Sequence, residues 1–159
     1  MRYKIIGKYI KELNFNIPNT KTFFLLSKDI ANYKINIDIK SSQVKQNIIE
    51  VLSSLGLSPT KDDFETINTK IVFSTIVELE DNKLSKEEME KIILIEVPSK
   101  IYPELRKIFV FLFEKSGFKD IKISETVDFE TLYRNRKIQW KVFLNSDFKN
   151  PLCFFNSSS

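Results

Sequence analysis

The sequence predicts a single small α+β domain in which strands come first and helices follow. Three observations favour this class. The chain has 159 residues, of which 42% are hydrophobic and 29% are charged, as in an ordinary one-domain globular protein. Apolar and polar residues alternate through much of the first half, which indicates strands. In the second half, a capping pattern and an apolar run bounded by proline and glycine indicate helices.

Three segments of the first half have the alternation of half-buried strands, namely 3–17, 33–39 and 65–79. In the first of them the odd positions are mostly apolar, so we expect that face to meet the core. Residues 44–58 fit a helix and a strand equally well by periodicity, and their neighbours favour a strand. The apolar cluster 23–26 is interpreted as a short buried strand or a cap over the core, with a partly exposed apolar wall for a ligand as the alternative.

Helix signals dominate residues 85–136. Ser85 and Glu88 form a capping-box pattern that begins a helix, which we expect to end at Pro98. A second helix begins near Pro103 and ends at Gly117, which has the position of a left-handed C-terminal cap. Asp128 can cap a final helix, 129–136.

The helix at 104–116 carries six successive apolar residues, 108–113. They cover more than one and a half turns at about 3.6 residues per turn, so the helix is apolar on every side. One modest sheet cannot cover all of it, and we infer that copies of the chain associate through this helix. The alternative is a central helix enclosed by its own chain. The predicted interface residues are Leu105, Ile108, Phe109, Phe111 and Leu112.

The composition excludes several kinds of active site. The chain has no histidine, one cysteine and three scattered glycines. A Ser-His-Asp or Cys-His site, a cysteine zinc cage and a glycine-rich phosphate loop therefore cannot be built from it. We expect neither an enzyme nor a bound metal or cofactor.

Charge and hydropathy predict a cytoplasmic protein. The N-terminus has no uninterrupted apolar run, and no stretch approaches the roughly 18 apolar residues of a spanning helix. The 25 Lys and Arg and 21 Asp and Glu give a net charge of +4. Because the two signs alternate along the chain, they indicate a solvated mixed surface more than a nucleic-acid-binding patch.

Colinear motifs give the sequence a family likeness. In the first strand these are Tyr9-Ile10-Lys11-Glu12-Leu13-Asn14-Phe15 and the following Pro18-Asn19. The second half adds, in order, Leu94-Ile95-Glu96-Val97-Pro98, Ile101-Tyr102-Pro103-Glu104-Leu105-Arg106, Ser116-Gly117-Phe118 and Val127-Asp128-Phe129-Glu130-Thr131-Leu132-Tyr133. Over roughly residues 3–137 the set resembles the SecB family of protein-export chaperones.

This resemblance implies a four-stranded antiparallel sheet packed by a long helix and shorter helices, assembled as a dimer of dimers. It also implies a homotetramer that binds unfolded preproteins and passes them to the SecA motor ATPase, without a cofactor. The domain would span residues 1–137. The tail, 138–159, carries scattered aromatic residues and is expected to be flexible or to pack back on the domain.

The resemblance and the residue pattern together suggest functional residues. The candidate client-binding wall is apolar and consists of Phe15, Phe23, Phe24, Leu25 and Leu26. Glu12 matches a family position that engages the motor, whereas Asn16 and Lys70 stand where acids are common. Alternatives to an export chaperone are a SecB-like chaperone of a toxin–antitoxin system and a basic nucleic-acid-binding module.

Overall fold

The computed structural model describes residues 2–29, 33–59, 67–80, 83–118, 123–135 and 153–158. For residues 28, 29, 33, 59 and 153–158 it describes the backbone alone. The sheet is antiparallel throughout, and its strands lie in the order β1-β4-β3-β2-β5. Their bounds are β1 Tyr3–Asn14, β2 Tyr33–Lys45, β3 Ile48–Pro59, β4 Lys70–Leu79 and β5 Cys153–Ser158.

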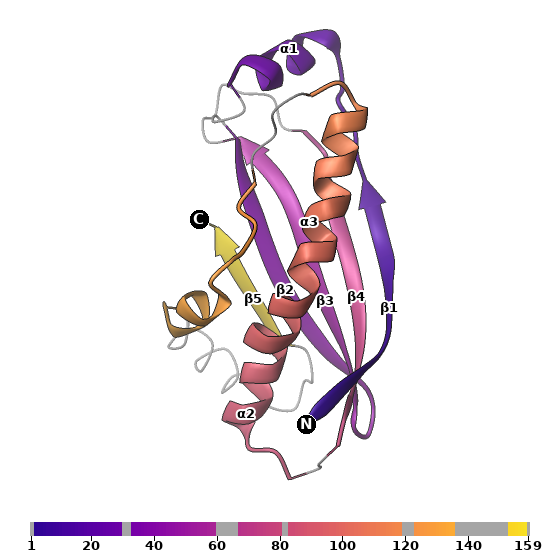
Figure 1. Ribbon diagram of the computed structural model, residues 1–159, viewed down its shortest axis with the longest axis vertical. Coiled ribbons are helices and arrows are strands. Elements are labelled where there is room, and N and C mark those ends of the chain that lie inside the picture. Colours follow the sequence, from indigo (N-terminus) through magenta and orange to yellow (C-terminus); the bar gives the residue numbers. More distant parts are fainter. Residues whose placement is uncertain are drawn as a thin grey trace.

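A long helix covers one face of this sheet. It is continuous through α2 (Lys86–Lys91), a π-helical segment η2 (Ile92–Glu96) and α3 (Val97–Lys115). In Figure 1 it runs obliquely across the strands, with α1 (Thr20–Asp29) at the far end and a short helix, 129–135, beside its beginning. The protein is therefore an α+β fold of two layers, as the sequence predicts.

The core lies between the helix and the sheet. The side of α3 that faces the strands carries Val97, Ile101, Leu105, Phe109 and Phe113, each at most 2% exposed. Their spacing of four residues places them on one stripe of the helix. The strands contribute buried apolar side chains from the facing side, including those of Ile39, Val51, Leu55, Ile71 and Val77.

Residues 44–58 contain the end of β2, a tight turn and most of β3, so the strand interpretation is correct. Asn47 sits in the turn with φ of 74°, a left-handed conformation that asparagine tolerates better than most residues. Gly56 lies inside β3, where a Cβ would meet the carbonyl oxygen of Thr69 at 3.1 Å. The glycine therefore permits a close backbone approach and does not end a helix.

The prediction that a helix ends at Pro98 is wrong, because the helix continues through this residue. A proline in a regular α-helix collides with the carbonyl group four residues before it. Here the π-helical turn η2 directly precedes α3, and Pro98 becomes the first-turn proline of α3. The hydroxyl of Ser99 donates to the carbonyl oxygen of Ile95 at 2.5 Å, which gives an acceptor near the wider turn a partner.

The apolar cluster at 23–26 belongs to helix α1 and is not a strand. Asn19 caps this helix, since its Oδ1 accepts from the backbone N–H of Thr22 at 2.8 Å and from the Thr22 hydroxyl at 3.1 Å. Leu26, 1% exposed, packs into the core, so α1 closes one end of the molecule.

The alternation predicted for the first strand fails in the middle of the strand, because β1 contains two irregularities. Its register with β4 shifts between Ile5 and Gly7 and again between Ile10 and Glu12. Each shift moves the following side chains to the opposite face. The helix side of β1 is therefore formed by Tyr3, Ile5, Lys8, Ile10 and Leu13, which pair with the core-facing odd residues of β4.

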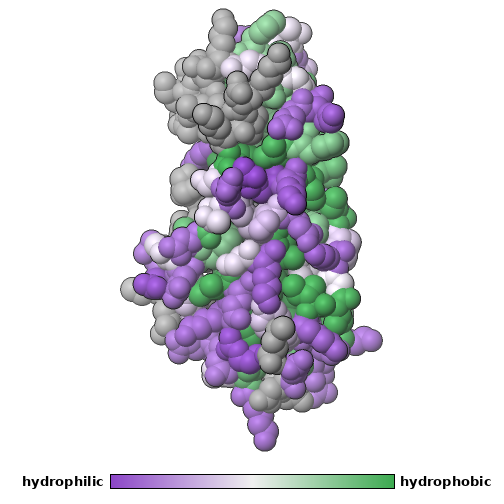
Figure 2. Space-filling model, viewed as in Figure 1, coloured by the Kyte–Doolittle hydropathy of each residue, from purple (hydrophilic) through white to green (hydrophobic). Residues whose placement is uncertain are grey.

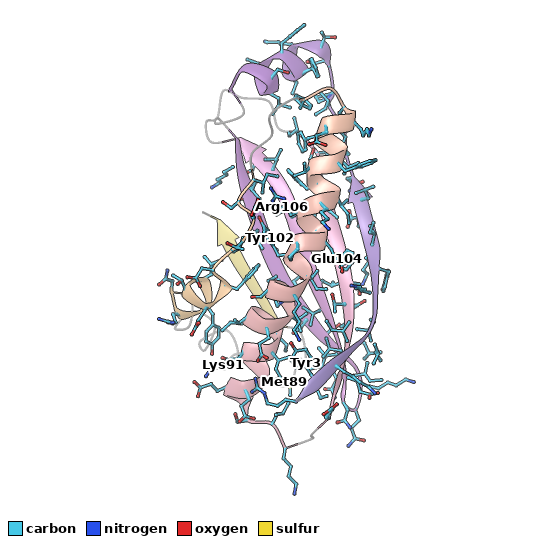
Figure 3. The ribbon with its side chains drawn as sticks, viewed as in Figure 1. Tyr3, Met89, Lys91, Tyr102, Glu104 and Arg106 are labelled. Carbon is cyan, nitrogen blue, oxygen red and sulfur yellow. The ribbon has the colours of Figure 1, made fainter. Side chains whose placement is uncertain are left out.

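The last described part of the chain before the tail is fastened to the long helix. Arg106 Nε donates to the carbonyl oxygen of Ile123 at 3.1 Å, and the Tyr102 hydroxyl donates to that of Ser124 at 2.6 Å. Figure 3 shows Tyr102 and Arg106 on the side of α3 that faces this segment. The hydroxyl of Tyr133 donates to the buried carboxylate of Glu90 at 2.7 Å, and burial together with Glu90 raises the pKa of Tyr133.

The tail contributes a fifth strand to the predicted sheet of four. Residues 153–158 pack back on the domain as β5 and pair with β2 from Asn36 to Ser41. Trp140, Phe143 and Phe148 lie outside the described residues. The division of the chain at residue 137 stays a prediction.

Gly117 provides a test of the helix end. It has φ of 96°, and the N–H groups of Gly117 and Phe118 bond to the carbonyl oxygens of Glu114 and Phe113, as in a Schellman cap. We expect Gly117→Ala to lower the free energy of unfolding by about 1 kcal/mol, measured by urea denaturation, because alanine disfavours this backbone conformation. Gly7→Ala is the control, since Gly7 lacks a positive φ and its added Cβ would have no neighbour closer than 3.7 Å. Equal losses in the two variants would contradict the cap.

Candidate functional site

A chain of aromatic rings leads from the core to the surface at the end of α3. Phe109 and Phe113 lie with ring centroids 4.8 Å apart, and Phe113 continues to Phe118 at 5.4 Å. From there Phe118 contacts Phe23 at 4.9 Å, and Phe23 contacts Phe24 at 5.7 Å. These are favourable aromatic separations. The sheet-covering core and helix α1 are thus one continuous apolar body.

The predicted client-binding residues gather at this end of the molecule, with different exposure. Phe15 packs edge-on against Phe113, at a centroid distance of 5.1 Å. Phe24 is 56% exposed, and Phe23 and Leu25 are partly buried. Leu26 is 1% exposed and belongs to the core, so it is not available to a client. The structure therefore brings Phe15, Phe23, Phe24 and Leu25 together around α1 and leaves Leu26 inside.

A second apolar surface lies between β1 and the long helix. Lys8 of β1 forms an ion pair with Glu104 of α3, and nearer the strand's end Phe15 contacts Phe113. Figure 3 shows Glu104 on the β1 side of the helix. Between these two contacts the chain places four apolar residues that we call the β1–α3 strip: Ile10, Leu13, Ile108 and Phe111.

The β1–α3 strip is open to solvent. Ile10 and Leu13 are each 46% exposed and Phe111 is 56% exposed, while Ile108 is partly buried. Elsewhere on β1, Ile6 and Tyr9 are each 47% exposed, and Tyr9 lies opposite Ser74 on the other face of the sheet. Figure 2 shows hydrophobic surface gathered on the β1 side of the molecule. Contiguous apolar surface of this kind marks an interaction site.

The five predicted interface residues divide between the core and this strip. Leu105 and Phe109 are 2% and 1% exposed against the chain's own sheet, so they are not offered to a second copy. Ile108, Phe111 and Leu112 lie outside that buried stripe and retain exposure. The helix is therefore covered on one side by its own chain. The helix surface that a second copy could contact is narrower than the run of six apolar residues implies.

The outer face of the sheet, opposite the helix, carries a polar cluster centred on Glu50. Its carboxylate accepts from the Ser74 hydroxyl at 2.7 Å, the Tyr9 hydroxyl at 3.0 Å and Lys11 Nζ at 3.2 Å. The Glu50 side chain is only 14% exposed. The Ser74 hydrogen bond, followed by the Tyr9 and Lys11 hydrogen bonds, holds the pKa of Glu50 below its ordinary value despite desolvation. Three strands, β1, β3 and β4, are joined by this one group.

The predicted motor-binding residue, Glu12, lies exposed on the same face. Its Oε1 accepts from the Asn14 side-chain amide at 2.8 Å. Asn14 pairs with Lys70 across the strands, so a cation lies diagonally from Glu12. On β2, burial raises the pKa of Asp38, against the opposing influence of Lys40 and Lys70. The outer face is thus of mixed charge, with acids and lysines close together.

Sequence patterns identified the aromatic residues near α1 but missed Ile10, Leu13 and Glu50. Strict alternation places Ile10 on the face away from the core, whereas the register shifts of β1 put it on the helix side. Leu13 lies on the helix side as alternation predicts, but it is 46% exposed and not buried. Glu50 has no local signal, because its partners come from two strands far along the chain. Only the pairing of β3 with β4 places it beside Ser74.

Comparison with known proteins decides the family. Residues 1–140 match the family described as preprotein translocase subunit SecB. The chain belongs to the SecB family. A protein-export protein SecB of Pelagibacter ubique is 42% identical over 134 residues, which cover 84% of this chain and 96% of that one. The SecB of Rhodospirillum rubrum is 31% identical over 137 residues, covering 83% and 80% of the two chains.

A solved structure agrees on the SecB fold. It is that of a SecB-like chaperone of Mycobacterium tuberculosis in complex with a peptide from an antitoxin, with a TM-score of 0.57 over 77% of this chain and 90% of that one. Because the two sequences are only 11% identical, this likeness concerns the fold alone.

The family relationship confirms the predicted activity: the protein is a SecB protein-export chaperone and not an enzyme. SecB membership implies binding of preproteins and of the SecA motor, and it places the protein's work in the cytoplasm. As a separate observation, none of the helices in the described part of the chain is long and apolar enough to cross a bilayer.

The Glu50 cluster predicts a pH-dependent contribution to stability. Since folding lowers the pKa of Glu50, its contribution is fully present above the unfolded value near 4.5 and is lost as pH falls through the folded value. At pH 7 we expect Glu50→Gln to lower the free energy of unfolding by about 1–2 kcal/mol through weakened charge-assisted hydrogen bonds.

Urea denaturation at several pH values between 3 and 7 measures this difference. It should shrink below about pH 4.5, where the wild-type carboxylate also loses its charge. Glu12→Gln removes one negative charge from the same face and serves as the control. A difference that stays constant down to pH 3 would show that the charge of Glu50 is not what stabilises the cluster.

Proposed function

We propose that this protein acts as a homotetramer, which holds an unfolded preprotein against apolar surfaces and passes it to SecA. The observation that carries the proposal is the uncovered apolar surface, because it includes both the β1–α3 strip and the residues around α1. A stable monomer rarely leaves so many large apolar side chains in water along one strand and one helix. One part is assigned to assembly and the other to the client.

Assembly is assigned to the β1–α3 strip. β1 is an edge strand of 12 residues with exposed apolar side chains, which invites pairing with another chain unless it is covered. A symmetric contact of this strip with its copy would cover Phe111, Ile10 and Leu13 together. Two such dimers would then join through the rest of the exposed helix surface, which includes Leu112, to give the dimer of dimers.

Client binding is assigned to Phe15, Phe23, Phe24 and Leu25. These residues surround the end of α3 and combine one exposed ring with partly buried neighbours, so a client side chain can add to an existing apolar body. Each such anchor contributes about 1–2 kcal/mol, less than full burial in a core. Several sites on one tetramer then hold one unfolded chain through its raised effective concentration.

Delivery to the motor is assigned to the outer face of the sheet, with Glu12 as the proposed contact. Glu12 is exposed and bonded only locally to Asn14 in the described contacts, so it can exchange that partner for a basic group. Glu50, by contrast, is held by three strands and is better suited to stiffen the face. The basic residues nearby, Lys70 above all, would make the docking sensitive to ionic strength.

Substitution of Phe111 tests the assembly. Because Phe111 is exposed, Phe111→Asp leaves the core of the subunit intact but places a charge in the proposed contact, and we expect the tetramer to dissociate. Light scattering coupled to size-exclusion chromatography should then give a mass near the subunit's 18.7 kDa. Gln46→Asp, in the exposed turn between β2 and β3, makes the same change of charge and should remain tetrameric. A Phe111→Asp variant that stays tetrameric would refute the strip as the contact.

Substitution of Phe24 tests the client site. We expect Phe24→Ser to raise the dissociation constant for reduced, carboxymethylated α-lactalbumin about fivefold, equivalent to about 1 kcal/mol of lost apolar contact. Val44→Ser is the matched control, because Val44 is 54% exposed but lies at the end of β2, away from α1. Fluorescence anisotropy of the labelled client measures both. Equal weakening by both substitutions would mean that general surface hydropathy, and not the α1 site, binds the client.

A further inference from the structure

The two edges of the four-strand sheet β1-β4-β3-β2 differ, because an additional strand pairs with only one of them. At one edge, among the residues that the structure describes, β1 pairs only with β4 and no strand lies on its far side. At the other edge β2 is covered by β5, in antiparallel register from Asn36 opposite Ser158 to Ser41 opposite Cys153. Among the described elements, β5 pairs with β2 alone. Without β5, the outward backbone N–H and C=O groups of residues 36–41 would have no strand partner.

The strand that covers this edge comes from the end of the chain. The preceding described segment, 123–135, is held to the long helix by Tyr102, Arg106 and Tyr133. The chain then returns to the sheet at Cys153, after residues 136–152. A strand of six residues that pairs on one side with β2 is a marginal element, because an isolated strand pair has little stability of its own.

The β2 edge suits an extended polypeptide of almost any sequence. Pairing along an edge uses backbone hydrogen bonds, which every unfolded chain can supply. Along Asn36–Ser41 the side chains of β2 alternate, with Ile37 and Ile39 buried on the helix side and Asn36, Asp38 and Lys40 on the outer face. An added strand therefore finds apolar neighbours on one side and polar neighbours on the other, a weak selectivity that fits a general client.

We propose that residues 153–158 are an internal competitor, which occupies the β2 edge in the empty chaperone and is displaced by an extended segment of the client. This inference rests on the proposed function and adds a means of regulation to it. A tethered segment competes at an effective concentration on the order of millimolar, so weak pairing is enough to keep the edge closed to poor clients. A client that is already bound elsewhere on the protein has a similarly raised effective concentration at the β2 edge, and it replaces β5 there.

Removal of the tail strand tests the proposal. If β5 occupies its edge about four-fifths of the time, deletion of residues 153–159 exposes the edge fully and tightens client binding about fivefold. The probes are reduced, carboxymethylated α-lactalbumin and a labelled peptide of the sequence Ser-Phe-Phe-Asn-Ser-Ser, which imitates β5 with serine in place of cysteine. We expect the peptide to bind the truncated chain and to bind the full chain at least fivefold more weakly.

Proline variants provide a test without truncation. In an antiparallel pair alternate N–H groups point to the partner, so the double variant Phe155→Pro, Asn156→Pro removes at least one N–H that β5 directs at β2. It should tighten client binding as the deletion does. Ser159→Pro, one residue beyond the strand, should behave as the wild type. In both strand-disrupting variants those amides of residues 36–41 that point to β5 should exchange with solvent faster.

The outcomes separate this inference from the proposed function. If all variants bind α-lactalbumin with the affinity of the full chain, client holding stands and the competitor is refuted. Unchanged exchange at residues 36–41 also refutes it, because β5 then does not cover the edge. Protection that rises with protein concentration would mean that a neighbouring copy supplies the strand, which overturns the internal competitor. If no form of the protein binds α-lactalbumin, the proposed function is refuted. The amide exchange of residues 36–41 would still show whether β5 covers the β2 edge.

Discussion

The structure depends on one packing constraint: a single helical layer covers a single face of the sheet. The helix presents Phe109 and Phe113 to the strands, and burial of this stripe against β3 and β4 stabilises the subunit. The opposite side of the same helix has no second layer from its own chain within the described residues. Phe111 therefore remains in solvent, although it comes from the same apolar run. The proposed assembly follows from how few layers the subunit has.

In the proposed function, the exposed surfaces have separate tasks. The β1–α3 strip follows one edge of the sheet and the helix beside it, and this surface is proposed to meet a second copy. The residues around α1 form a compact end where an aromatic chain emerges from the core, a shape better suited to single side chains of varied sequence. On the outer face, Glu50 ties three strands together and keeps that surface polar. In the proposed function, both faces of the sheet and one end of the helix take part.

Local chemistry made much of this fold predictable from sequence. The Ser85 cap, the Gly117 helix end and the Asp128 cap all have the expected hydrogen bonds, because each depends on residues within a few positions. The features that sequence reasoning missed depend on distant partners or on a local exception. The register shifts of β1 exist only relative to β4, and Glu50 acquires its role only when strands pair. At Pro98, a π-helical turn overrides a rule that normally ends a helix.

The placement of β1 beside β4 has a consequence for how the molecule forms. The first strand finds its partner about 65 residues later, since Tyr3 pairs with Leu79 and Asn14 with Lys70. The β2–β3 hairpin closes through a tight turn and can form early, whereas β1 must wait until β4 has been made. A nascent subunit therefore carries an unpaired, apolar N-terminal strand for much of its synthesis, and this export chaperone is itself briefly the kind of chain that it exists to protect.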